Sequence, residues 1–156
     1  MVTREQRNRL DPDLGVLAGR LLFAVQRELF ATLAARGFDD LHPRHGAVLA
    51  YLDAGGVRAT ELSRLSGQHK QVIGTMIDEL EGLGYVERRP DPADRRAKLI
   101  SPTERGLSQM RAADQIMADL QERHASRVGH EAFAQFKAVL ADVTEHQRSH
   151  PRPDVS

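Results

Sequence analysis

Hydrophobic residues recur along most of the chain with the three- and four-residue spacing of amphipathic helices. The first run covers residues 13–36, between Asp11-Pro12, a pair typical of helix starts, and Gly37, a typical helix end. Its apolar residues form one broad face that predicts burial against another surface. They are Leu14, Leu17, Leu21, Leu22, Val25, Leu29 and Leu33.

Two shorter helices are expected next. One begins near Pro43 and ends before Gly55-Gly56, and the other begins at Thr60, whose hydroxyl can cap it, and ends at Gly67.

A fourth helix is predicted for residues 68–83. Its buried face is defined by the spacing i, i+3, i+4, i+7 of Ile73, Met76, Ile77 and Leu80. The opposite face then presents amides, a hydroxyl and a carboxylate, which belong to Gln68, Gln71, Thr75 and Asp78.

The pattern changes after this helix. Residues 85–89 and 97–101 are predicted to form two short strands around the turn-rich loop 90–94. A long helix with Ser101 or Thr103 as its N-cap, a break at Gly129 and a last helix follow. We therefore expect one mainly α-helical domain over residues 1–156, with a winged helix-turn-helix at 43–101, flanking helices at 11–36 and 103–147, and a flexible tail at 148–156.

Composition removes several classes of protein. The 156 residues are 40% hydrophobic and 28% charged, which is ordinary for a globular protein. Cysteine is absent, so disulfides and thiolate sites are excluded. The polar first ten residues and the short apolar runs indicate neither a signal peptide nor a membrane span, and we expect a cytoplasmic protein.

Charge is balanced overall and uneven locally. The chain has 22 basic and 22 acidic residues. Residues 87–105 nevertheless hold six basic and four acidic side chains, so positive charge collects around the predicted hairpin.

A short helix, a turn, a polar-faced helix and a basic hairpin make a winged helix-turn-helix, whose second helix fits the major groove. Gln68 and Gln71 are expected to read adenine edges. Lys70 is expected to meet a phosphate, Thr75 a thymine methyl or a backbone oxygen, and His69 either a phosphate or the protein interior. Gly74 lets the helix backbone sit close to the groove wall.

The hairpin is expected to reach the adjacent minor groove with its arginines. Its candidate contacts are Arg88, Arg95, Arg96 and Lys98, and the carboxylate of Asp94 is expected to hold one guanidinium in a fixed orientation.

The chain resembles the MarR (multiple antibiotic resistance regulator) family. The resemblance is carried by DELEGLGYVER at 78–88 and RPDPADRRAKLISPTERG at 89–106, and the helix order over 11–147 agrees. It implies a homodimer held by the first helix and the last two helices of each subunit, which binds a pseudo-palindromic double-stranded operator. It also implies Asp94 as the wing acid and Arg96 as the minor-groove arginine. Pro102 departs from the aliphatic residue usual before Thr103, and the absence of cysteine excludes the peroxide-sensing branch.

The resemblance also implies a repressor released by a small aromatic or phenolic effector. Arg20, His45 and Tyr51 are the candidate ligand contacts. A ligand-independent regulator and a protein-interaction module without ligand sensing are the alternatives. The outward glutamines and Arg96 speak against a module that has lost DNA binding.

No catalytic arrangement, cofactor site or metal site is expected. The chain shows no nucleophile with a base and no phosphate-binding loop. His42 and His45, and His124 and His130, are spaced like metal ligands but come without the carboxylate partners that a closed site requires.

Overall fold

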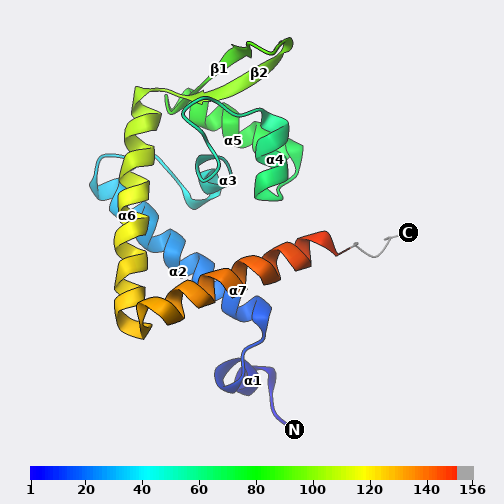
Figure 1. Ribbon diagram of the computed structural model, residues 1–156, viewed down its shortest axis with the longest axis vertical. Helices are drawn as coiled ribbons and strands as arrows, with labels where there is room; N and C mark the ends of the chain where they lie inside the picture. Colours follow the sequence, from blue (N-terminus) through cyan, green and yellow to red (C-terminus); the bar gives the residue numbers. More distant parts are fainter. Residues whose placement is uncertain (151–156) are drawn as a thin grey trace. The chain divides into compact units, whose positions relative to one another are not determined.

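The computed structural model describes residues 1–150, which divide into two compact units. The first is Met1–Asp114 and the second begins at Gln115. The elements are α1 (Arg4–Leu10), α2 (Leu14–Ala35), the 3₁₀ helix η1 (Pro43–His45), α3 (Gly46–Leu49), α4 (Ala59–Ser66), α5 (Lys70–Gly82), β1 (Val86–Asp91), β2 (Asp94–Pro102), α6 (Glu104–Val128) and α7 (His130–Ser149). The predicted class, mainly helical with one β-hairpin, is confirmed (Figure 1).

The N-terminal segment contains a helix that the sequence analysis missed. Thr3 and Gln6 form a reciprocal capping box at the start of α1, although α1 buries no residue. Helix α2 begins later than predicted, because Asp13 rather than Asp11 is its N-cap and accepts a hydrogen bond from the Val16 N–H at 2.9 Å. Asp11 ends α1 instead.

The predicted second helix is much shorter in the structure. It consists of η1 and α3 and ends at Leu49, so Tyr51 and Leu52 lie beyond it. The chain turns at Asp53, whose carboxylate accepts the Gly55 N–H at 3.0 Å, and Gly56 has φ = 90°. This turn lies beyond the early helix end, and Leu52 between them is still buried.

Helix α4 has no side-chain cap. Its N-cap is Arg58 in an extended conformation, and Thr60 lies inside the first turn, so the predicted capping role of Thr60 is wrong. The end of α4 is as predicted, because Gly67 takes the left-handed conformation with φ = 71°.

The core of the first unit forms around α5. Ile73, Met76, Ile77 and Leu80 are buried as predicted, together with residues of α3, α4 and the hairpin. Leu62 and Tyr85 have no exposed surface. This packing fixes which face of α5 points outward.

The hairpin is longer than predicted. Strands β1 and β2 pair antiparallel from Val86↔Pro102 to Asp91↔Asp94, and the turn is reduced to residues 92–93. Val57 adds a bridge to Ile100. Within the first unit the hairpin extends beyond α4 and α5 as a wing (Figure 1).

Helix α6 is capped by Thr103, which accepts the Gly106 N–H at 3.1 Å. The alternative cap, Ser101, is buried inside β2. Gly129, with φ = 99°, separates α6 from α7, and α7 includes Arg148 and Ser149, so the predicted tail begins too early. The rest of that tail, 151–156, lies outside the described residues. No helix within residues 1–150 combines the length and hydrophobicity needed to span a membrane.

Candidate nucleic-acid interface

The start of α5 differs from the prediction in one respect that matters for the candidate site. His69 is the N-cap, and its Nδ1 accepts the Gln71 N–H at 3.3 Å. Gln68 therefore lies in the turn before the helix, where its carbonyl accepts a hydrogen bond from the Ser63 hydroxyl at 2.6 Å. His69 is exposed, which rules out the packing role considered for it.

The outward face of α5 keeps its polar character. Lys70, Gln71 and Thr75 are all exposed. The Thr75 hydroxyl donates to the Gln71 carbonyl at 3.0 Å, so its hydrogen is already used, and a new contact would involve its methyl group or its oxygen as an acceptor. Gly74 lies within this helix, and a Cβ built on it meets nothing within 4 Å.

Arg88 is tied to α5 and does not stand free. Its guanidinium contacts Asp78 at 2.5 Å and Glu81 at 2.6 Å. The hydrogen bond to Asp78 is the main cause that raises the pKa of Arg88 above its ordinary value. Arg88, which was one of the predicted DNA contacts, thus joins the wing to the C-terminal half of α5 and offsets the acidic charge there.

The wing is braced by a pair that the sequence analysis did not find. Arg58 Nε donates to Asp91 Oδ2 at 2.7 Å, and Asp91 Oδ1 accepts the Ala93 N–H at 2.8 Å. These hydrogen bonds, led by that from Ala93, lower the pKa of the Asp91 carboxyl, which is nearly buried. Arg58 and Asp91 are 33 positions apart, and their pairing carries no sequence signal.

The tip of the wing exposes the expected cations, but Asp94 acts differently from the prediction. Asp94 Oδ1 accepts the backbone N–H of Arg96 at 3.0 Å. Its carboxylate therefore fixes the turn and does not hold a guanidinium, which was the predicted role. Arg95, Arg96 and Lys98 are exposed, and no carboxylate within residues 1–150 forms an ion pair with them. Their charge is available to a partner.

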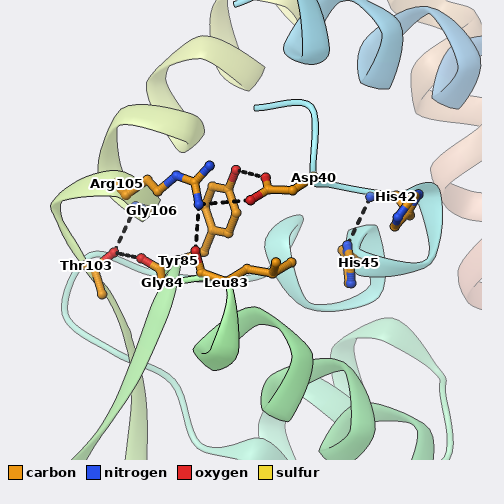
Figure 2. Close-up of polar contacts among 9 residues, drawn as sticks. All are labelled: Asp40, His42, His45, Leu83, Gly84, Tyr85, Thr103, Arg105 and Gly106. Atoms are coloured by element: carbon orange, nitrogen blue, oxygen red, sulfur yellow. Dashed lines mark hydrogen bonds and ion pairs between the residues drawn. The ribbon is translucent and has the colours of Figure 1, made fainter. Parts of the chain in front are cut away.

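The candidate ligand residues lie in very different surroundings. His45 is buried, and its Nδ1 accepts the His42 N–H at 3.0 Å (Figure 2). Its Nε2 lies 2.8 Å from Glu79 Oε2. Burial is the first cause that lowers the pKa of His45. Since both ring nitrogens are engaged, a ligand contact would require this network to open. Tyr51 is 39% exposed, and Arg20 donates to the Asn8 carbonyl at 3.3 Å.

The second unit has an open groove between α6 and α7, and its polar groups are already paired. His130 Nε2 lies 2.8 Å from Glu122, and Lys137 Nζ donates to Gln121 at 2.6 Å. The ring of His124 stacks on that of Phe133 at 6.4 Å. Within residues 1–150, no three metal-binding side chains gather at one place.

Known proteins share this architecture. Residues 39–97 match the sequence model of the MarR family. The transcriptional regulator HosA of Escherichia coli O111:H- is 28% identical over 122 residues, which cover 76% of this chain and 90% of HosA.

Two solved structures of proteins named CouR are also similar. The transcriptional repressor CouR bound to a 23-mer DNA duplex is 26% identical, with a TM-score of 0.71, and the match covers 88% of this chain and 96% of that one. CouR from Rhodococcus jostii RHA1 bound to p-coumaroyl-CoA is 28% identical, with a TM-score of 0.70, over 84% of this chain and 91% of that one.

Proposed function

This chain belongs to the MarR family of transcriptional regulators, and we propose that it binds a specific, pseudo-palindromic double-stranded DNA operator as a homodimer. One observation carries the proposal. The exposed start of α5 offers Lys70, Gln71 and Thr75, while the wing tip offers cations that are not neutralised inside the first unit.

The proposed contacts divide by chemistry. Gln71 in the first turn of α5, and Gln68 just before it, read base edges in the major groove, and Lys70 and His69 lie near phosphates. Arg95, Arg96 and Lys98 approach the minor groove from the wing. Arg88 and Asp94 contribute by fixing α5 and the wing turn, since their side chains are engaged within the protein.

Selection of bound sequences from random DNA, followed by fluorescence anisotropy titration at several salt concentrations, tests this proposal. We expect half-sites about one helical turn, roughly 34–36 Å, apart. The affinity should fall steeply with salt, because lysines and arginines release counterions from phosphates. Binding without sequence preference, or binding that is insensitive to salt, contradicts the proposal.

The homodimer is supported by apolar surface that each unit leaves uncovered. Helix α2 exposes Leu14, Leu17, Leu21 and Leu22 to between 42% and 59%, and α7 exposes Phe136, Val139, Leu140 and Val143 to between 37% and 56%. Such surfaces are typical of subunit contacts. Analytical ultracentrifugation should show a dimer, and Leu21→Glu should shift it toward monomer and weaken DNA binding.

We further propose that the protein is a repressor and that a small aromatic effector releases it from DNA. CouR, which binds p-coumaroyl-CoA, supports this class of effector. Arg20 and Tyr51 in the first unit remain the proposed contacts, and His45 can join them only if its hydrogen-bond network opens. Thermal-shift screening with aromatic acids, phenols and aromatic acyl-CoA thioesters tests the idea. Compounds that bind must also lower the affinity for the operator. The proposal includes no catalytic step.

A further inference from the structure

A polar cluster around one buried side chain, which we call the latch, joins three segments of the first unit: Asp40 in the loop between α2 and η1, Tyr85 between α5 and β1, and Arg105 in the first turn of α6 (Figure 2). Tyr85 is fully buried, and its hydroxyl donates to Asp40 Oδ1 at 2.5 Å. Arg105 lies 3.0 Å from Asp40 Oδ2, with its guanidinium carbon 4.3 Å from the centre of the Tyr85 ring. The Tyr85 side chain thus hydrogen-bonds to the loop between α2 and η1 and also lies against the start of α6.

The same turn of α6 is also bonded to the end of α5. Arg105 donates to the Leu83 carbonyl at 2.6 Å, and Leu83 is the C-cap of α5. The Thr103 hydroxyl donates to the Gly84 carbonyl at 2.5 Å, and the Thr103 N–H to the Tyr85 carbonyl at 3.0 Å. The bond to Leu83 satisfies a carbonyl that the end of α5 leaves open, and the other two tie α6 to the segment that follows α5.

The backbones approach closely at this point. A Cβ on Gly106 would lie 2.1 Å from the Tyr85 carbonyl oxygen, a distance that only a hydrogen atom permits. The end of α5 and the beginning of α6 are therefore held by side chains and by direct backbone contact, with little freedom for one to turn against the other.

The charges in the latch are stable near neutral pH. Burial alone would raise the pKa of Asp40, but hydrogen bonds from Tyr85 and Arg105 outweigh it and hold this pKa below the usual value. Burial, followed by the bond to Asp40, raises the pKa of Tyr85. The carboxylate remains ionised and the phenol neutral, so the geometry persists across the physiological range.

We propose that the Asp40–Tyr85–Arg105 latch is a positioning device that holds α5 and the wing at a fixed angle to the start of α6. Helix α6 directly follows the wing in the chain, so in the proposed dimer this angle contributes to how each subunit presents its α5. In a dimer, the latch would thereby restrict binding to one spacing between half-sites. The inference rests on the proposed function and concerns the geometry in which the dimer presents its two α5 helices to the operator.

The test removes one hydrogen bond and leaves the packing in place. Tyr85→Phe in the full chain keeps the buried ring and the contact with Arg105, and deletes only the bond to Asp40. Duplexes carry the selected half-sites at the preferred spacing and at spacings one base pair shorter and longer. We expect the affinity ratio between preferred and altered spacings to fall roughly three- to tenfold relative to the wild type.

Two further variants separate positioning from stability. Asp40→Asn should reduce spacing discrimination in the same direction, since it removes the charge that holds Arg105. Val48→Ala, in the buried core outside the latch, should lower stability and leave the discrimination unchanged. Urea unfolding of each variant shows whether it is folded.

The outcomes are distinct. Wild-type protein that binds no selected duplex contradicts the proposed function. Wild-type protein that binds but tolerates every spacing overturns the latch inference alone. The inference is also overturned if both latch variants fold and discriminate spacings like the wild type, or if Val48→Ala relaxes the discrimination as much as they do.

Discussion

Replacement of Gly74 by alanine should change folding and DNA binding in opposite directions. Gly74 lies within α5, and a Cβ there meets no atom within 4 Å in the protein. Glycine inside a helix costs about 0.5–1 kcal/mol relative to alanine. Gly74→Ala should therefore raise the free energy of unfolding by about this amount, because the added methyl group encounters no steric conflict.

The added methyl group should instead clash with the DNA duplex. Gly74 lies one turn after Lys70 and Gln71 and directly before Thr75 on α5, so the open space beside it lies next to the groove in the proposed complex. Overpacking a close contact costs about 1–3 kcal/mol, or roughly a 5- to 150-fold rise in Kd. A variant that folds better and binds worse cannot be explained by misfolding.

Gly106→Ala is the matched control. Its Cβ would lie 2.1 Å from the Tyr85 carbonyl oxygen, and backbone cannot yield as a flexible side chain does. This variant should lose about 1–3 kcal/mol of unfolding free energy or more. Urea denaturation at matched protein concentration and anisotropy titration give both quantities for each variant. The reasoning fails if Gly74→Ala is less stable than the wild type, or if it binds the operator equally well.

Three further predictions follow from single groups. Arg96→Ala should weaken operator binding by about 1–3 kcal/mol and reduce its salt dependence, whereas Arg88→Ala should change the salt dependence less, because that guanidinium is already paired. Thr75→Val should still distinguish thymine from uracil in the operator and Thr75→Ser should not, since the methyl group makes the contact; equal discrimination by both refutes this. His45 binds a proton less readily in the folded than in the unfolded protein. The free energy of unfolding should therefore fall as pH drops below 6.5, by at most about 1.4 kcal/mol per pH unit from this group. His45→Gln should remove that slope between about pH 5 and 6.5, where the paired carboxylates remain ionised.

The fold could be predicted wherever periodicity carried the signal. The stripe through Ile73, Ile77 and Leu80 identified the buried side of α5, because a helix that packs on one face must repeat with its own period. Helix ends were less predictable. Asp11 and Asp13 both match an N-cap, and only the backbone conformation shows that Asp13 performs this role.

The residue types of the candidate site could be predicted from the sequence, but the pairs that these residues form could not. The exposed cations of the wing tip followed from local composition. The partners of Asp91 and Tyr85 did not, because Arg58 and Asp40 lie 33 and 45 positions away from them, and nothing along the chain distinguishes them from other charged residues. Sequence therefore identified which groups face outward, and the structure was needed to show what holds them there.

These pairings also explain how a chain with zero net charge can bind a polyanion. Around the hairpin, Glu87 pairs with Arg89, Asp91 with Arg58, and Arg88 with acidic residues of α5. These acidic groups are thus paired with cations along the wing, and Asp94, which accepts a backbone N–H but keeps its charge, is outnumbered by Arg95, Arg96 and Lys98. Positive charge remains at the tip, where a phosphate backbone would meet it. Local charge at the point of contact, and not the sum over the chain, sets the electrostatic attraction within a Debye length.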